Sequence, residues 1–178
     1  IMVGEIRDGE TATMSVQASL TGHLVFSTLH TNDAASAVTR LLDLGIEPYL
    51  ASSSLVAVLA QRLVRRICDH CAEPDTSDEA LRFLEYTHRQ SDAQPKRGVG
   101  CEQCRQTGFR GRLGIFELLT VNDEIRDLVQ SRANAARIRE AAASGGMILM
   151  RDDGIQKVCD GFTTFDEVSR VSGIIDER

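Results

Sequence analysis

The sequence predicts an α/β protein that carries a metal-binding insertion and ends in a small helical part. Its first third alternates segments rich in β-branched and apolar residues with segments of helical apolar rhythm, which favours a mostly parallel sheet. Two Cys-x-x-Cys pairs then interrupt the chain, and short helix-like segments follow Asn122. We therefore expect three parts, at residues 1–66, 67–112 and 113–178.

The first part is expected to run as strand, helix, strand and two further helices. Gly22 ends the first helix, because a glycine readily takes the conformation that follows a helix. Asn32-Asp33 caps the second helix, and Pro48 opens the third. The predicted strands are residues 1–7 and 23–30; the predicted helices are residues 10–20, a segment ending at Leu44, and residues 49–65.

Four of the five cysteines form two short knuckles, Cys68-Asp69-His70-Cys71 and Cys101-Glu102-Gln103-Cys104. Four thiolates are the ligand number of a tetrahedral structural Zn²⁺ site. The 29 residues between the pairs exceed the usual zinc-ribbon spacing, so an insertion must loop out. Two disulfides or four free thiols are the alternatives. Cys159 stands apart and is expected to be a small buried apolar residue.

The remaining elements are shorter. Within the insertion we expect one helix at residues 77–86 and a polar loop at residues 90–100. A strand is expected at residues 113–120, and Asn122, Asn134 and Thr164 are plausible N-caps of the helices that follow. Those helices are predicted at residues 123–131, 135–143, 155–160 and 165–171.

Composition excludes some classes of function. The net charge is −6, there is no Trp, and aromatic residues make up 4% of the chain, all of which argue against a nucleic-acid-binding surface. No apolar run is long enough to predict a membrane span, and no signal peptide is visible. The chain opens on an apolar run that resembles a strand already under way, so we expect a fragment of a longer protein.

Several polar residues stand where chemistry often occurs. Glu5 and His30 each end a predicted strand, and ligands favour the carboxyl ends of parallel strands. Arg110 and Arg112 lie beside Gly111, which would let the backbone approach an anion closely. Considered alone, each of these residues is more commonly a solvated surface residue or a structural residue than a catalytic or binding one.

Longer sequence motifs favour a functional role for these residues. The stretches 1–8 and 21–33 closely resemble the secretion ATPase superfamily of type II secretion and type IV pili. Residues 59–65, the tetracysteine element and residues 108–117 resemble the same superfamily, and all occur in the expected order. The resemblance covers nearly the whole chain.

The resemblance implies the C-terminal part of a RecA-like, hexameric ATPase core followed by a zinc subdomain and a helical subdomain. Glu5 matches the glutamate after the Walker B strand, which activates or polarises the attacking water. His30 ends the histidine box, where the family senses the γ-phosphate of ATP. Arg112 matches an arginine near the nucleotide phosphates, and Arg7, within the Walker B match, is a further candidate nucleotide-site residue. ATP and Mg²⁺ would be cofactors of the full-length protein.

The same resemblance implies an assembly-type motor of the type II secretion branch. Retraction-type motors resemble the first third but lack the knuckles. The expected place of work is the cytoplasmic face of the bacterial inner membrane, as a homo-hexamer on the secretion platform and its cytoplasmic recruiting domain. A type IV pilus assembly ATPase and a stand-alone zinc-binding interaction module are the alternatives.

The sequence also departs from the family. It contains no Gly-x-x-x-x-Gly-Lys-Ser/Thr motif, and the family's aspartate-rich box and upstream arginine fingers would precede Ile1. We therefore expect half an active site, with residues for water positioning and γ-phosphate sensing, and no ATP hydrolysis by this chain alone.

Overall fold

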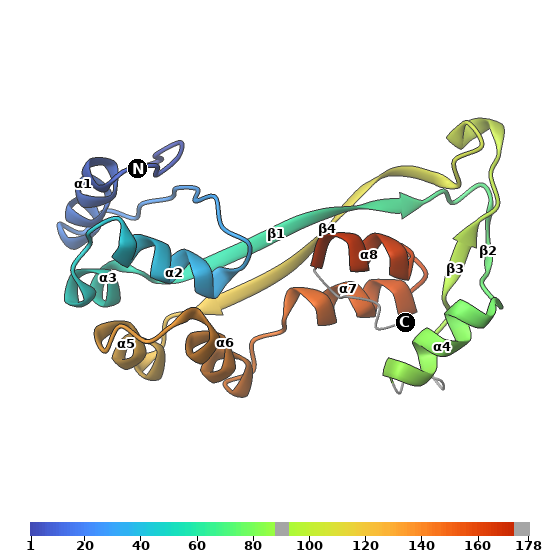
Figure 1. Cartoon of the computed structure of the whole chain (residues 1–178). Helices are drawn as coiled ribbons and strands as arrows, with labels where there is room; N and C mark the ends of the chain where they lie inside the picture. The colour runs from blue at the N-terminus through green and yellow to red at the C-terminus, as the bar shows by residue number, and fades with distance from the viewer. Residues whose placement is uncertain (88–92, 173–178) are drawn as a thin grey trace. The chain divides into compact units, whose positions relative to one another are not determined.

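A computed structural model describes residues 1–87 and 93–172 (Figure 1). The chain forms two compact units. The first consists of residues 1–60 and 117–148, and the second of residues 61–116 and 149–178. Two long strands, β1 (Ala57–Ile67) and β4 (Phe109–Thr120), pair with each other and are each shared between the units. The three functional parts expected from the sequence stay a prediction.

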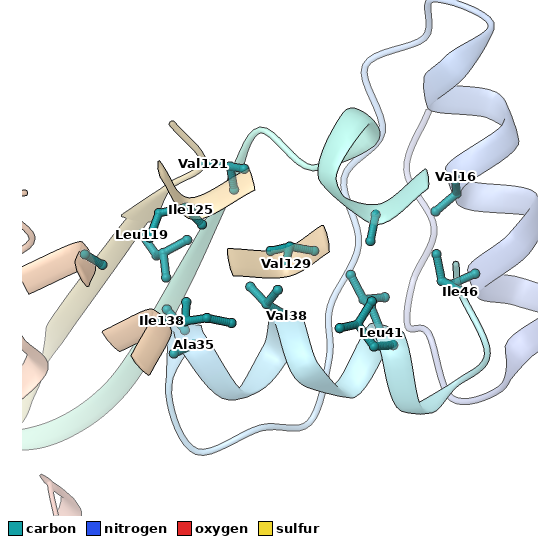
Figure 2. Close-up of a cluster of buried hydrophobic side chains, with 14 of the residues drawn as sticks. Val16, Ala35, Val38, Leu41, Ile46, Leu119, Val121, Ile125, Val129 and Ile138 are labelled. Atoms are coloured by element: carbon teal, nitrogen blue, oxygen red, sulfur yellow. The ribbon is translucent and has the colours of Figure 1, made fainter. Parts of the chain in front are cut away.

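The first unit is built from five helices around one apolar core. Val38 and Leu41 of α2 face Ile125 and Val129 of α5 and Ile138 of α6 in this core (Figure 2). Leu119, at the end of β4, is fully buried in the same cluster. The helices of this unit are α1 (Gly9–Leu20), α2 (Ala34–Asp43), α3 (Pro48–Ser54), α5 (Asp123–Gln130) and α6 (Ala135–Ser144).

The helix boundaries follow the predicted caps. The Asp33 side chain accepts from Ser36 N at 2.7 Å, and Asn122 and Asn134 cap α5 and α6 in the same way. Gly22 and Gly45 follow α1 and α2 with φ of +95° and +92°, a region that glycine enters without strain. These predictions are confirmed.

The two predicted strands of the first part form only partially. Met2 and Phe26 make one isolated parallel bridge, and the rest of residues 1–7 and 23–30 is extended chain outside any strand. Phe26 N donates to Ile1 O at 3.0 Å, and Val3 N donates back to Phe26 O at 2.8 Å. Ile6 N then donates to Thr28 O at 2.9 Å. The segments are therefore paired in parallel, but too intermittently to count as strands.

The predicted helix at residues 49–65 is confirmed as far as Ser54 and is wrong beyond it. The helix α3 stops at Ser54, and Leu55 is already extended with ψ of 123°. From Ala57 the chain is strand β1, in which Val64 is buried while Leu59 and Leu63 are 59% and 45% exposed. The leucines recur every four residues, as they would on one face of a helix. The segment forms a strand because it contains β-branched residues and pairs with β4.

The second unit holds the insertion. β2 (Ala72–Pro74) and β3 (Lys96–Gly98) pair antiparallel and enclose α4 (Asp78–Thr87), close to its predicted bounds. The predicted polar loop at 90–100 is wrong at its end, where β3 forms. Its residues 90–92 lie outside the described part of the chain. A short 3-10 helix, η1 (Glu102–Cys104), forms the last three residues of the second knuckle, and Cys101 is its N-cap.

Two packed helices complete the second unit, α7 (Met150–Cys159) and α8 (Phe165–Ser172). The helix α7 begins five residues before its predicted start, because Asp152 and Asp153 lie in its first turn, where carboxylates suit the helix dipole. Gly154 lets the helices approach closely, since a Cβ there would lie 2.5 Å from Val168 Cγ1. No helix in the described residues is both long and apolar enough to cross a membrane.

Candidate functional site

The structure brings Glu5, Arg7 and His30 together. Arg7 Nη2 lies 2.6 Å from Glu5 Oε2, and His30 Nε2 is in contact with Glu5 Oε1. The Glu5 side chain is 21% exposed, whereas those of Arg7 and His30 are 77% and 86% exposed. Parallel pairing of residues 1–6 with residues 24–28 explains the contact, because both segments then end at the same edge.

The charges around Glu5 favour its ionised form. The hydrogen bond from Arg7 is the main reason that the pKa of Glu5 is lowered, and partial burial opposes this shift. The charge of Arg7 and the contact with His30 lower it further. The pKa of Arg7 is raised in return by the hydrogen bond to Glu5. An ionised carboxylate beside an imidazole suits the orientation of a water molecule near an anionic substrate.

Arg112 lies elsewhere in the chain. It is an exposed residue of β4 in the second unit, and Gly111 before it has φ of +80°. Arg110 Nη1 donates to Gln103 Oε1 at 3.4 Å, so the first residues of β4 lie next to the second knuckle. The nucleotide role of Arg112 stays a prediction.

The four knuckle cysteines form a compact cluster. Their sulfur atoms all lie within 4.8 Å of one another. The separations are 3.9 Å for Cys68–Cys101, 3.8 Å for Cys71–Cys104 and 3.7 Å for Cys101–Cys104. A tetrahedron with Zn–S bonds of about 2.3 Å has sulfur atoms about 3.8 Å apart, so the spacing fits such a metal. No disulfide joins any of the five cysteines, so the disulfide alternative is wrong.

Backbone amides around the cluster favour thiolates. Cys101 N and Gly108 N donate to Cys104 Sγ at 3.2 and 3.3 Å. Burial opposes ionisation of Cys104, but these donors outweigh it and lower its pKa to about 6. Burial raises the pKa of Cys71 to about 12 among its neighbouring thiols. The Cys104 thiol is therefore ionised more readily than that of Cys71, and a bound cation would favour the thiolate form of Cys71 as well.

The fold brings the knuckles together through the base of the insertion. β2 begins directly after Cys71, and β3 ends shortly before Cys101, so their pairing of Ala72 with Gly98 sets the separation of the two knuckles. Gly98 and Gly108 touch through their backbones, since a Cβ on Gly98 would lie 2.0 Å from Gly108 O. Cys68 N also donates to Gly108 O at 2.9 Å. The spacing of the cysteines predicted a metal site. The close approach of Gly98 and Gly108 brings its four candidate ligands together.

Three further residues, Asp33, Glu117 and Arg139, meet at the start of α2. Arg139 forms an ion pair with Asp33, and the buried Glu117 accepts from Ala34 N at 3.1 Å. Asp33 was expected as a cap, but nothing local in the sequence indicated Arg139 or Glu117. They lie 106 and 83 residues away from their partners.

A family model described as "Type II/IV secretion system protein" matches residues 1–170. The chain belongs to this family. The resemblance to this family that the sequence motifs indicated is therefore confirmed.

The chain is about half identical to proteins of both branches of this secretion family. It is 52% identical over 97% of its length to the type II secretion system protein E of Pseudomonas aeruginosa and 51% identical over 97% to the type II secretion system ATPase E of Vibrio cholerae. It is 50% identical over 94% of its length to the type IV pilus assembly ATPase PilB of Thermus thermophilus. The chain spans 34%, 34% and 19% of these relatives.

Solved structures show the same fold. The pilus retraction motor PilT with bound ADP is similar over 100% of this chain and 40% of that one, with a TM-score of 0.66 at 24% identity. The Legionella pneumophila ATPase DotB is similar over 97% of this chain and 38% of that one, with a TM-score of 0.62 at 21% identity. The α/β class is therefore confirmed.

Proposed function

We propose that the chain is the C-terminal portion of a hexameric, RecA-like ATPase that drives pseudopilus assembly in type II secretion. The observation that supports this best is the contact of Glu5 with His30 in a member of the secretion family. In this proposal Glu5 polarises the attacking water and His30 senses the γ-phosphate. Arg7 holds the Glu5 carboxylate in place, and Arg112 approaches the nucleotide. ATP and Mg²⁺ are bound mainly by residues upstream of this chain.

The tetracysteine cluster has a structural role in the proposal. Four cysteine ligands leave no open position for a catalytic water, whereas a closed site stabilises a fold. The sulfur spacing and the N–H donors to Cys104 suit Zn²⁺. Zn²⁺ would hold the knuckles and the base of the insertion together.

The choice of branch rests on a smaller observation. Residues 58–65 resemble the type II secretion ATPases slightly more than the pilus assembly ATPases. The similar identities to both groups keep pilus assembly as the second candidate. Complementation with the full-length gene separates them, because it would restore either protein export or pilus formation in the corresponding deletion strain.

The first prediction concerns Glu5. In the full-length parent, Glu5→Gln removes the charge that polarises water while keeping the shape, so ATP hydrolysis falls by about 100-fold or more. Nucleotide binding, measured with a fluorescent ATP analogue, stays near the parent value. Glu10→Gln, at the exposed first turn of α1, is the matched control and leaves hydrolysis unchanged.

Unchanged hydrolysis in Glu5→Gln would refute the proposed role of this residue. The 178-residue chain alone is expected to hydrolyse no ATP above background. Turnover by this chain that disappears with Glu5→Gln would contradict that expectation.

A further inference from the structure

The segment that carries His30 is held at both ends. Upstream, Thr28 is fixed to the Glu5 segment twice, because Ile6 N donates to Thr28 O at 2.9 Å and Thr28 Oγ1 donates to Gly4 O at 2.8 Å. Downstream, Asp33 caps α2 through Ser36 N. His30 lies between these two anchors along the chain.

The downstream anchor has an external partner. Arg139 of α6 forms an ion pair with Asp33, whose side chain is 21% exposed. Burial opposes the ionisation of Asp33, but the Ser36 amide and Arg139 together lower its pKa, so the pair is charged at neutral pH. A partly buried ion pair of this kind holds its groups more firmly than a solvated one.

The helix that supplies Arg139 is itself fixed. Its neighbour Ile138 is fully buried and packs beside Ala35 and Val38 of α2 (Figure 2). Glu117 adds a second carboxylate at the start of α2, 3% exposed and accepting from Ala34 N. The start of α2 is thus fixed by α6 on one side and by β4 on the other.

We propose that Arg139 is a positioning residue for ATP hydrolysis, which acts through Asp33 to hold His30 against Glu5. The inference rests on the proposed function. Without the ion pair, the segment keeps its upstream hydrogen bonds and the Asp33 cap on α2, but it loses the contact that ties Asp33 to α6. His30 then samples other positions, and fewer active sites have His30 beside Glu5.

The structure offers variants that separate positioning from folding. Asp33→Asn breaks the ion pair but keeps a side chain that caps helices as well as aspartate does. Arg139→Gln removes the charge from the other partner. Arg137→Gln is the matched control, because Arg137 lies on the same helix and pairs with Glu140 at the surface.

The test measures ATP hydrolysis by the full-length parent. Asp33→Asn and Arg139→Gln should each lower kcat by at least about fivefold with little change in KM for ATP. The double variant should be no worse than the poorer single variant, and Arg139→Lys should recover part of the loss. The midpoint of thermal unfolding should differ little between these variants and Arg137→Gln.

The other possible results separate failure of the positioning role from failure of the proposed function. Parent-like kcat in both single variants overturns the inference, as does a loss in the double variant equal to the product of the single losses. If Glu5→Gln lowers hydrolysis by about 100-fold while Asp33→Asn and Arg139→Gln both keep the kcat of the parent, only the positioning role fails. If the parent hydrolyses no ATP, or Glu5→Gln has no effect, the proposed function fails and the inference with it.

Discussion

At the scale of single residues, Glu167 is a buried carboxylate of the second unit that accepts three hydrogen bonds from two arginines. It is 2% exposed and accepts from Arg65 N at 2.9 Å, from Arg65 Nη2 at 2.8 Å and from Arg170 Nη2 at 3.0 Å. Arg65 also lies over the Phe109 ring, 4.2 Å from its centroid. Burial opposes ionisation of Glu167, but the two arginines lower its pKa to about 2. Glu167 therefore attaches α8 to β1.

This gives a prediction about pH. A carboxyl group whose pKa falls from 4.5 to about 2 on folding contributes about 3 kcal/mol at neutral pH. The contribution is complete above pH of about 5 and is lost as pH falls from there toward 2. Urea unfolding of the 178-residue chain should show Glu167→Gln to be destabilised at pH 7, with a difference from the parent that shrinks below pH of about 4.5.

Asp166→Asn is the control, since Asp166 is an exposed neighbour on the same helix. A pH-independent difference between Glu167→Gln and the parent would show that the carboxylate is not held by charge. Metal release at low pH affects both proteins alike, so it cancels in the comparison.

The residue scale also shows what sequence can and cannot predict. Glu5 and His30 are recognisable because each ends a motif, and Asp33 because N-caps are local. Arg7 was singled out without a defined partner, and its ion pair with Glu5 required the fold. Arg139 had no local signal at all, since its partner is distant in the chain.

At the scale of elements, β1 shows why helix and strand are confused. A small-residue helix at α3 runs directly into a strand whose leucines recur every four residues. The period alone cannot separate the two, because the deciding contact is with β4, more than 40 residues later. Helices with local caps, such as α5 and α6, were predicted almost to the residue.

The packing of α7 on α8 gives a prediction at this scale. Gly154→Ala should destabilise the chain by about 1–3 kcal/mol, because its Cβ would overlap Val168, which is fully buried. This exceeds the gain of up to about 1 kcal/mol that alanine gives a helix over glycine. Chemical denaturation measures the loss.

A second substitution tests the cause of that loss. Combining Gly154→Ala with Val168→Ala should cost less than the sum of the single losses, because the smaller partner makes room. Gly145→Ala, at a C-cap with φ of −80° and ordinary 3.4 Å contacts, should change little. Additive losses would indicate that the two helices do not meet at Gly154.

At the scale of the whole molecule, the four cysteines belong to the second unit only. The apolar core of α2, α5 and α6 is independent of them. Two units with separate sources of stability are expected to respond differently to loss of the metal.

Metal removal is therefore predicted to act on one unit. Chelation, or Cys104→Ser, should abolish binding of one Zn²⁺ per chain and increase hydrogen exchange across residues 68–108, while amides in the Val38 and Ile125 core stay protected. Mass spectrometry with metal analysis measures both effects. Cys159→Ser, a buried cysteine outside the cluster, is the control and keeps the metal. Full metal content in Cys104→Ser would contradict the assigned ligand set.

The close approach at Gly108 has a practical consequence. Gly108 bonds to both knuckles, through its carbonyl to Cys68 N and through its amide to Cys104 Sγ, and the next residue is Phe109, on which Arg65 stacks. The chain contains no Trp. A tryptophan placed at residue 109 would be the chain's single indole fluorophore, one residue from the cluster and beneath a guanidinium. Its emission would give an optical signal for occupancy of the cysteine cluster in the 178-residue chain.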